Sequence, residues 1–440
     1  MAQPVPPTHG TVVMKFGGTS VANKERITRA AQRIVRAKEE GNRVVAVLSA
    51  QGKFTDELVA MAHDVSPRPH PREMDMLLST GERISCALAA MVINDLGHEA
   101  ISLTGSQAGI VTDTSHTKAK ILDVRTNRVE EALDAGAIVL VAGFQGTSAF
   151  QRAGGDYEIH GNVTTLGRGG SDTTAVAIAA ALGADVCEIF TDVAGVFSAD
   201  PRIVPEARKL THVSFEEMLE MSASGAGVLQ LRSVEYARNH HVRIHCRSSF
   251  DDGPGTFVLT EQETMERPLV TAVTHSTDEA RVTLTGVPDT PGVAGRVFTA
   301  LAGANVNVDM IIQNEPATEG QMADMSFTAP KDDVASAVDA LQPLVDEYGM
   351  GLQTDPNMGK VSLVGAGMKS HPGVAAKTFS VLGEAGVNIE MISTSPIKIS
   401  CVVRGTDVPE AVRRLHAAFE LGEDAVQPED VMGDHRPRVS

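Results

Sequence analysis

Two segments in the last third of the chain repeat one another. PGVAGRVFTALAGANVNVDMI begins at Pro291 and PGVAAKTFSVLGEAGVNIEMI begins at Pro372, an offset of 372 − 291 = 81 residues. The offset aligns Asn307 with Asn388. Self-similarity of this kind indicates two copies of one supersecondary unit. Each copy predicts a strand, a Pro-Gly turn, a helix and a second strand that opens with Val-Asn.

The first two-thirds of the chain alternates short apolar runs with helical patterns. Short buried-type strands are predicted at 12–16, 44–49, 137–142, 186–191 and 242–247. Helices are predicted at 24–40, 76–96 and 173–182. This alternation is typical of an α/β sandwich with a largely parallel sheet. This alternation ends near residue 265, and the repeat follows it. We therefore predict three domains, at 1–265, 266–358 and 359–440.

The chain has 440 residues and a formal net charge of −18. Such a charge disfavours nucleic acid as a partner, because backbone phosphates need a positive surface. An anionic substrate such as ATP must then be held by local positive groups and by backbone N–H donors.

The cysteines predict a reducing compartment. Cys86, Cys187, Cys246 and Cys401 lie far apart and form no C-x-x-C pair, so we expect reduced, buried thiols and neither a disulfide framework nor a zinc site. The first residues lack the basic and apolar regions of a signal peptide. No run of about 18 apolar residues marks a membrane span. The sequence therefore predicts a cytoplasmic protein with no membrane partner.

The segment KFGGTS at 15–20 joins a predicted strand to a predicted helix. Glycines at such a junction let backbone N–H groups approach a polyphosphate, and a helix N-terminus adds partial positive charge. Lys15, at the end of the strand, can reach a phosphoryl group during its transfer. A Gly-Gly turn is more often only a turn, and the Walker pattern G-x-x-x-x-G-K-[ST] is absent from the sequence.

A second glycine-rich stretch, TTLGRGGSDTT at 164–174, runs into an alanine-rich helix. In a structural interpretation, Ser171 or Asp172 caps that helix. In a functional interpretation, two glycine loops that each lead into a helix N-terminus form two facing anion sites, one for the nucleotide and one for the acceptor. Asp172 would then orient Lys15, and the planar guanidinium of Arg168 would pair with a substrate carboxylate.

Three further segments complete a pattern. They are SAQGKFTDEL at 49–58, GERIS at 81–85 and TDVAGVFSADPR at 191–202. In this order the segments closely resemble the aspartate kinases of the amino-acid kinase superfamily. VSLVGAGMKSHPGV at 361–374 resembles the regulatory region of the same family, so the resemblance covers nearly the whole chain. It implies an amino-acid kinase αβα sandwich followed by two α+β ferredoxin-like ACT domains.

The resemblance also implies an activity, the ATP-dependent phosphorylation of the β-carboxylate of L-aspartate to 4-phospho-L-aspartate, the first step toward lysine, threonine and methionine. Lys15 would stabilise the γ-phosphoryl group and Asp172 would organise the site. The substrate-binding residues that it implies are Thr55, Glu82, Arg168 and Ser171. The residues that it places around ATP, besides Lys15, are Gly17, Gly18, Thr191, Asp192, Phe197 and Arg202. Glu82 alone fits equally well as a surface partner of Arg83.

The implied chemistry needs no general base, because a β-carboxylate has a pKa near ~4 and is ionised at pH 7. Catalysis then requires in-line positioning and positive charge, supplied by Lys15 and by Mg²⁺ bound to the nucleotide. We expect no metal site of the protein's own. One cluster could suggest a metal site, namely His240, His241, His245 and Cys246. It flanks and enters a predicted strand, where neighbouring side chains point to opposite faces, so joint coordination of a metal is not expected.

Two departures from the family pattern stand out. The chain has Gly-Ala-Gly-Val at 225–228 where relatives carry G-A-K-V or G-S-K-I. The lysine missing at Gly227 is expected near ATP, and one charge-assisted contact is worth roughly 1.5–3 kcal/mol, so we expect a weakened but active kinase.

Extra residues (SAFQRAGGDYEIHG) also lie within 147–162, near the acceptor loop. They are either a surface insertion or an element that reshapes the substrate mouth.

The repeat resembles paired ACT domains, which bind amino acids such as lysine and threonine at their interface and join subunits. The contacts implied in the first copy are Asp289, Ala294, Asn307, Asp309 and Gln313. Those implied in the second copy are Lys369, Ser370, Val374, Asn388, Ile389 and Ser395. Each asparagine fits a strand-edge turn almost equally well.

Feedback is expected to be relaxed or altered. Residues 313–327 carry Pro316, Ala317 and Ala323 where feedback-inhibited relatives present hydroxyl groups, and a lost hydroxyl removes a hydrogen bond.

The family further implies a homo-oligomer or an assembly with an internally initiated regulatory chain. Two other functions stay open: an ACT-linked kinase for another acidic amino acid in a specialised pathway, and a weakly catalytic amino-acid sensor.

Overall fold

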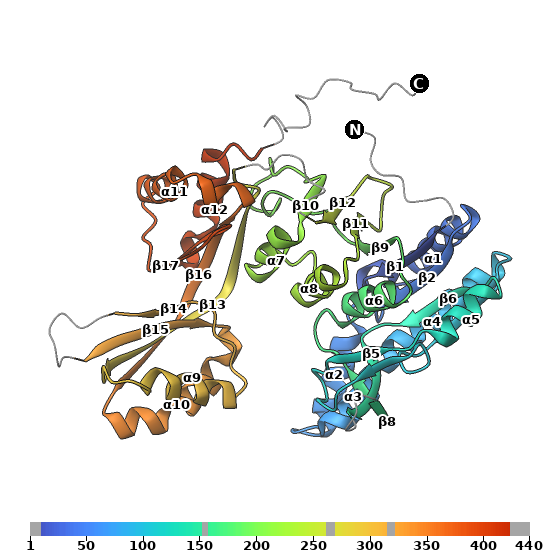
Figure 1. The fold of residues 1–440 in the computed structure, drawn as a ribbon, viewed down its shortest axis with the longest axis horizontal. Helices are drawn as coiled ribbons and strands as arrows, with labels where there is room; N and C mark the ends of the chain where they lie inside the picture. The colour runs from blue at the N-terminus through green and yellow to red at the C-terminus, as the bar shows by residue number, and fades with distance from the viewer. Residues whose placement is uncertain (1–9, 152–156, 261–268, 315–321, 423–440) are drawn as a thin grey trace. The chain divides into compact units, whose positions relative to one another are not determined.

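The computed structural model describes residues 10–151, 157–260, 269–314 and 322–422, without the side chains of residues 369 and 370. The chain divides into two compact units. The first unit contains Met1–Val196, Lys209–Ser222 and Gly227–Met265, and the second contains Phe197–Arg208, Ala223–Ala226 and Glu266–Ser440. In Figure 1 the first unit runs from blue to green, and most of the second runs from yellow to red.

An eight-stranded sheet forms the centre of the first unit, in the order β10-β12-β11-β9-β1-β2-β6-β3. Its strands are β1 (Thr11–Phe16), β2 (Arg43–Leu48), β3 (Ala100–Leu103), β6 (Ile138–Ala142), β9 (Val186–Thr191), β10 (His212–Ser214), β11 (Ile244–Ser248) and β12 (Thr256–Leu259). All are parallel except β10 and β12, which run the other way. Continuous apolar runs such as IVLVA in β6 are buried along their whole length, as expected for parallel strands that are covered on both faces.

Helices cover both faces of this sheet. The helices of the first unit are α1 (Lys24–Glu39), α2 (Phe54–Val65), α3 (Pro71–Leu78), α4 (Thr80–Asp95), α5 (Asn127–Asp134), α6 (Gly170–Ala181), α7 (Phe215–Ala223) and α8 (Leu231–His240). Of these, α1 and α4 pack on one face of the sheet and α6 on the other, whereas α3 packs against β8 (Tyr157–Thr165). Apolar side chains of α1 and α4 pack in one cluster with Val12, Met14 and Phe16 of β1. Because side chains alternate along a strand, Val13 and Lys15 point to the opposite face.

The single helix predicted at 76–96 is wrong. The structure has α3 and α4, separated at Ser79. The hydroxyl of Ser79 donates to Met76 O at 3.0 Å and that of Thr80 donates to Leu77 O at 2.7 Å. Such side-chain hydrogen bonds compete with the backbone ladder and favour a break.

The stretch Pro71–Asp95 that contains both helices is long and apolar enough to cross a membrane by length and composition alone. Half of its most apolar window is buried inside the protein, and core helices of soluble proteins meet the same criterion. The stretch is therefore weak support for a membrane span.

A smaller sheet completes the first unit, in the order β5-β4-β7-β8. Its strands are β4 (Ile110–Thr112), β5 (Ile121–Val124), β7 (Gln145–Gln151) and β8 (Tyr157–Thr165). β7 and β8 form an antiparallel hairpin, so the extra residues at 147–162 extend two paired strands. Residues 152–156 of this segment lie outside the described residues.

One six-stranded antiparallel sheet forms the centre of the second unit, in the order β14-β15-β13-β16-β18-β17. The first copy of the repeat supplies β13 (Ala272–Val287), α9 (Val293–Gly303), β14 (Ile311–Gln313), β15 (Ala323–Ala329) and α10 (Val334–Tyr348). The second supplies β16 (Gly351–Val364), α11 (Gly373–Glu384), β17 (Met391–Ser395), β18 (Lys398–Arg404) and α12 (Val408–Ala418). The repeat thus folds as the sequence predicts, with the same order of elements in each half.

The two central strands belong to both copies. β13 and β16 pair from Ala272 opposite Val364 to Thr285 opposite Gly351. Val273, near the start of β13, lies in the apolar core of the second copy, whereas Val282 lies in that of the first. The exact boundary between the copies stays a prediction.

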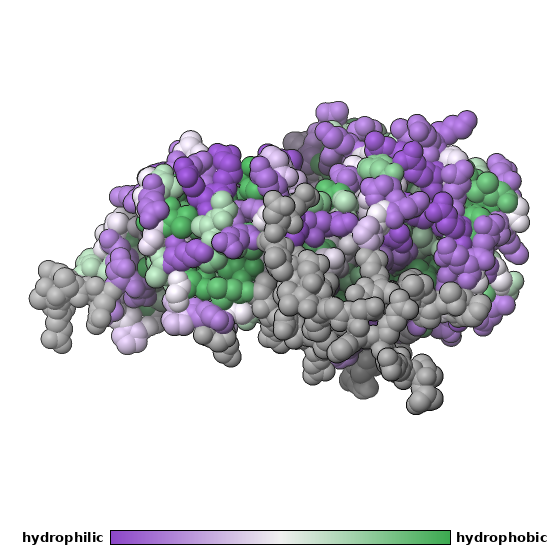
Figure 2. Space-filling model, turned by 90° about the horizontal axis from the view of Figure 1, so that it is seen from above, coloured by the Kyte–Doolittle hydropathy of each residue, from purple (hydrophilic) through white to green (hydrophobic). Residues whose placement is uncertain are grey.

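The visible surface is mostly hydrophilic, with smaller apolar areas among the polar side chains (Figure 2). This agrees with a chain that carries a net charge of −18. The thiols do not contribute to this surface, since all four cysteines are free and buried, as predicted.

Candidate active site

Part of the predicted site follows the carboxyl ends of the parallel strands β1, β2 and β9, with Gly17, Thr55 and Asp192 as examples. The loop with Arg168 and the start of α6 instead follow β8 of the smaller sheet, and Glu82 lies in α4. Three backbone hydrogen bonds join neighbouring loops at this edge, from Gly17 N to Phe190 O (3.3 Å), from Ser49 N to Phe16 O (3.1 Å) and from Gly143 N to Leu48 O (3.1 Å). β1 lies between β2 and β9, and the chain leaves β1 toward β2 and reaches β9 only later. Ligands of parallel α/β sheets bind at such a point, where the strand order reverses.

Lys15 and Asp172 meet at this edge. Lys15 Nζ lies 2.5 Å from Asp172 Oδ1, and the two side chains are only 12% and 8% exposed. Lys15 reaches Asp172 because the alternation along β1 sends it away from α1 and α4 and toward α6, which packs on the other face. The expectation that these two side chains meet is confirmed, whereas a cleft that holds a nucleotide beside them stays a prediction.

The helix that carries Asp172 begins earlier than predicted. α6 starts at Gly170, after Gly169 in the left-handed conformation (φ 70°), so Ser171 and Asp172 lie inside the first turn. The prediction that one of them caps the helix is therefore wrong. No side chain caps α6, and the N–H groups of a first helical turn lack intrahelical partners. This end of the helix keeps the partial positive charge that attracts an anion.

The loop after β1 approaches its neighbour closely. A Cβ atom on Gly18 would lie 2.8 Å from Ala50 O and 2.9 Å from Gly52 O, so only glycine fits here. The loop continues as a short 3-10 turn, Gly18–Val21, and α1 begins at Lys24 with Asn23 as its cap. α1 thus begins at the predicted residue, but its N-terminus is already capped, since Asn23 Oδ1 accepts Arg26 N–H at 3.0 Å. The loop offers backbone N–H groups and Lys15 instead.

Glu82 lies in the first turn of α4 and is 3% exposed. Its Oε1 accepts the N–H of Ala50 at 3.3 Å, while Oε2 is buried and has no hydrogen-bond partner among the described residues. Burial raises the pKa of Glu82 to about 7, against the smaller opposing effects of its backbone hydrogen bonds and of Arg83. A buried carboxylate with one unused oxygen fits a cationic group such as an ammonium. The interpretation of Glu82 as a surface residue is wrong.

The remaining substrate residues lie on loops around this point. Arg168 is exposed in the loop between β8 and α6, and no described side chain pairs with it. Ser171 is buried against the end of β6, where a Cβ on Gly143 would lie 2.7 Å from Ser171 Oγ. Thr55 is half-buried in the first turn of α2.

The residues expected around ATP fall in both units. Thr191 ends β9, its carbonyl accepts Ser249 N–H at 2.8 Å, and its hydroxyl donates to Asp192 Oδ1 at 3.1 Å. Phe197 and Arg202 belong to the segment Phe197–Arg208 of the second unit. There Arg202 forms a forked pair with Asp200. A place for Phe197 and Arg202 beside ATP stays a prediction.

The candidate effector residues of the second unit are mostly exposed, at Asp289, Asn307, Asp309, Gln313 and Asn388, whereas Val374 is buried and Ala294, Ile389 and Ser395 are intermediate. The Asn388 amide donates to Glu390 Oε1 at 3.2 Å. The side chains of Lys369 and Ser370 lie outside the described residues, as do Pro316 and Ala317. Their roles as effector contacts stay predictions.

The sequence analysis missed a pair of ionic contacts between the copies. Lys360 Nζ of β16 lies 2.5 Å from the Asp309 carboxylate, and Arg281 of β13 lies 2.8 Å from the Glu390 carboxylate. Asp309 and Glu390 are equivalent in the repeat, since 309 + 81 = 390. Each acidic residue therefore pairs with a cation from the central strand of the other copy. Acidic residues at equivalent positions were the available signal.

Among the residues that the structure describes, no three His, Cys, Asp or Glu side chains are grouped to hold a metal ion. His245 instead stacks on Phe257, with ring centroids 3.9 Å apart, and contacts Pro254 O at 2.7 Å.

Comparison with known proteins agrees with this geometry. Residues 10–248 match the amino acid kinase family, and residues 281–346 and 361–419 each match the ACT domain. The fold and the site thus define a member of the amino acid kinase family that carries two ACT domains. The aspartokinase of Mycolicibacterium smegmatis is 56% identical over 416 residues, which cover 94% of this chain and 97% of that protein. The chain belongs to the aspartokinase family.

Solved structures support the same assignment. E. coli aspartokinase III in complex with aspartate and ADP superposes with a TM-score of 0.78 at 26% identity, covering 93% of this chain and 99% of that chain. The same enzyme with lysine and aspartate gives a TM-score of 0.70 at 26% identity, over 93% and 99% of the two chains.

The raised pKa of Glu82 predicts how stability depends on pH. Folding moves this pKa from 4.5 to about 7, so the folded protein binds the proton more tightly than the unfolded chain. Stability therefore falls as pH rises between these two values, by roughly 3 kcal/mol in total. We expect Glu82→Gln to be more stable than the wild type above pH 7 and equally stable below pH 4.5.

Urea unfolding across this pH range measures the difference. Glu57→Gln is the control, since it makes the same substitution at an exposed carboxylate on α2. A difference between Glu82→Gln and wild type that does not change with pH would contradict the burial argument.

Proposed function

We propose that this chain transfers the γ-phosphoryl group of ATP to the β-carboxylate of L-aspartate, forming 4-phospho-L-aspartate and ADP. The contact of Lys15 with Asp172 at the uncapped N-terminus of α6 carries the proposal. It joins a cation, a carboxylate and a helix end in one place, at the edge of the sheet where ligands bind. The related E. coli enzyme that holds aspartate and ADP supports the choice of both substrates.

The reaction needs positive charge rather than a base. The acceptor carboxylate is ionised at neutral pH, so one of its oxygens attacks the γ-phosphorus while the bond to the bridging oxygen of ADP breaks. Negative charge on the phosphoryl oxygens is met by Lys15, by N–H groups of α6 and by Mg²⁺ that enters with the nucleotide. Asp172 keeps Lys15 in the cleft and off the surface.

Two groups distinguish the amino and carboxyl ends of the acceptor. The unused Oε2 of Glu82 accepts the substrate ammonium, and the exposed guanidinium of Arg168 pairs with the α-carboxylate. Ser171 and Thr55 line the space between these two groups. Gly17, Gly18, Thr191 and Asp192 border the nucleotide, with Phe197 and Arg202 as further contacts.

An ADP-release assay with a panel of acidic amino acids tests the proposal. We expect turnover with L-aspartate that exceeds turnover with L-glutamate, and Lys15→Met should lower kcat by about a hundredfold or more, as does removal of other groups that stabilise transition-state charge. Lys24→Met, an exposed lysine at the start of α1, should leave kcat unchanged. Turnover with another acceptor only would favour the specialised kinase, and none at all would favour the amino-acid sensor.

Restoring the missing lysine should strengthen nucleotide binding. No atom lies within 4 Å of a Cβ built on Gly227, so a side chain fits there. We expect Gly227→Lys to lower the KM for ATP by about tenfold, the low end of a charge-assisted contact. Gly295→Lys adds the same charge at an equally open position of α9 in the second unit and should not change this KM. An unchanged KM for ATP in Gly227→Lys would contradict the proposal.

The second unit supplies regulation. Two ACT domains and the lysine complex of the related E. coli enzyme support amino-acid effectors, lysine or threonine, and assembly through these domains as a homo-oligomer or with a shorter regulatory chain. We also propose a cytoplasmic location, since all four cysteines are free and buried, as in proteins of reducing compartments.

Feedback should be weak. Ala323, one of the positions that lack a hydroxyl, is buried in β15, which leaves Pro316 and Ala317 as the other candidate positions. We expect lysine plus threonine at low-millimolar concentration to leave most of the aspartate-dependent rate. A thermal-shift titration run in parallel separates loss of binding from loss of coupling. Strong inhibition by the pair would refute relaxed feedback.

A further inference from the structure

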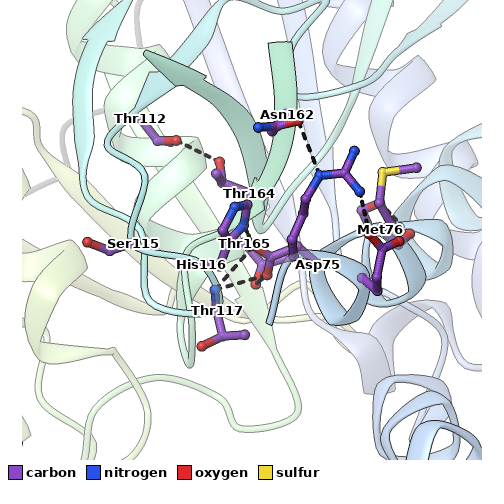
Figure 3. A network of polar contacts seen from close by, with 12 residues as sticks. Asp75, Met76, Thr112, Ser115, His116, Thr117, Asn162, Thr164 and Thr165 are labelled. Atoms are coloured by element: carbon purple, nitrogen blue, oxygen red, sulfur yellow. Dashed lines mark hydrogen bonds and ion pairs between the residues drawn. The ribbon is translucent and has the colours of Figure 1, made fainter. Parts of the chain in front are cut away.

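Asp75 of α3 is fully buried and has no place in the proposed chemistry. Its Oδ1 accepts the N–H of Thr117 at 3.0 Å and the hydroxyl of Thr165 at 2.5 Å. Its Oδ2 accepts a hydrogen bond from Nδ1 of His116 at 2.6 Å. Figure 3 shows the Thr117 backbone N–H and the side chains of His116 and Thr165 meeting at the carboxylate. One group thus joins α3, the loop at 113–118 and the end of β8.

A buried carboxylate is costly unless several donors satisfy it. A contact without a buried charge of this kind also holds α3, since Arg72 Nε donates to Asn162 Oδ1 of β8 at 3.3 Å between two half-buried side chains. The donors that converge on Asp75 lie instead on two backbone segments that are far apart in the sequence. The carboxylate is therefore placed to fix those two segments relative to each other.

One of the fixed residues is held in an unfavourable conformation. Thr117 has φ 67°, a left-handed value that is a genuine outlier for a β-branched residue, and such conformations cost about 1–3 kcal/mol. Its N–H donates a hydrogen bond to the carboxylate of Asp75. The carboxylate therefore helps to hold Thr117 where the free chain would not stay.

The loop that contains Thr117 lies directly against the acceptor loop. A Cβ on Gly167, the residue before Arg168, would lie 3.3 Å from Thr117 O. Thr165, the other partner of Asp75, stands two residues before Gly167, and its carbonyl accepts Ala119 N–H at 2.9 Å. Movement of either partner of Asp75 would therefore move the backbone that carries Arg168.

Arg232 of α8 ties together the same two segments from elsewhere. Its guanidinium donates to Leu166 O at 2.8 Å and to Ala119 O at 2.9 Å. These carbonyls belong to the loop before Arg168 and to the end of the loop that Asp75 holds. The acceptor loop is thus fixed by a buried anion on α3 and by a half-buried cation on α8.

We propose that Asp75 is a positioning residue for the acceptor amino acid. It acts through Thr117 and Thr165 to fix the loop at 166–169, and Arg232 is its counterpart. The inference rests on the proposed function, because it takes Arg168 as the group that binds the α-carboxylate. We call Asp75 and Arg232, with the two backbone segments that they join, the clamp. The clamp controls binding of the acceptor and leaves the nucleotide contacts of β1 and β9 unchanged.

Steady-state kinetics on the full-length protein tests this. Asp75→Asn keeps the side-chain shape and removes the charge. We expect its KM for aspartate to rise by about tenfold or more, as for loss of hydrogen bonds to a charged group, while its KM for ATP stays within about twofold. Arg232→Gln should show the same split between the two substrates. Arg72→Gln, on the same helix but outside the clamp, should change neither KM.

Thr117→Gly distinguishes positioning of the loop from a general loss of stability, because it should change the KM for aspartate only in the Asp75→Asn background. Glycine adopts a positive φ without cost, so it should recover part of the aspartate KM in the Asp75→Asn background and change little by itself. Calorimetric titration of aspartate in the presence of ADP measures acceptor binding without turnover. If Asp75→Asn fails to fold, Arg232→Gln and its combination with Thr117→Gly test the same clamp.

The outcomes are distinguishable. Wild-type protein that neither binds nor phosphorylates aspartate would overturn the proposed function itself. Wild-type protein that is active, with an unchanged aspartate KM in both Asp75→Asn and Arg232→Gln, would overturn the clamp alone. Equal effects on both substrates, accompanied only by a lower melting temperature, would also overturn it and reduce Asp75 to a structural residue.

Discussion

The ion pair of Lys15 with Asp172 organises the first unit, because it requires several elements to be in register. Lys15 must lie near the end of β1 with its side chain on the face away from α1 and α4. Asp172 must lie in the first turn of α6. Two nearly buried charges 2.5 Å apart satisfy each other, although such pairs contribute little net stability once their desolvation is counted. Their value is chemical. In the proposed reaction, Lys15 would contact the incoming phosphoryl group, and Asp172 would hold the Lys15 ammonium in place before the nucleotide binds.

The acceptor side of the site follows a different physical rule. Glu82 is left with one buried oxygen unpaired, and its pKa is raised to about 7 by burial. An unsatisfied buried acceptor costs free energy in the empty protein. Under the proposed function, a substrate ammonium would remove that cost when it binds and would restore the charged form of Glu82, so part of the binding energy would come from relief of that cost. Arg168, which is exposed, bears no such cost and depends on the loop that carries it.

Local sequence rules predicted the strands and the repeat in the second unit, because these follow from periodicity. The meeting of Lys15 with Asp172 was predicted from two glycine-rich loops that each lead toward a helix. Local rules failed where a single residue overrides the pattern. Gly169 in the left-handed conformation starts α6 early, and the hydroxyls of Ser79 and Thr80 divide a helix. The contacts of Asp75 span 41 and 90 positions, and no local pattern announces partners at such separations.

The second unit is not simply the C-terminal part of the chain. Its apolar core includes Ala199, Val204 and Ala207, which come from the segment Phe197–Arg208. Within the same segment Ser198 Oγ contacts His416 Nε2 at 2.9 Å and Leu421 O at 3.0 Å. A regulatory chain that begins downstream of this segment exposes the side of the core that it covers. Such a chain must cover that apolar surface with a partner or lose the stability that its burial provides. Assembly would then be a condition of its folding as well as a means of regulation.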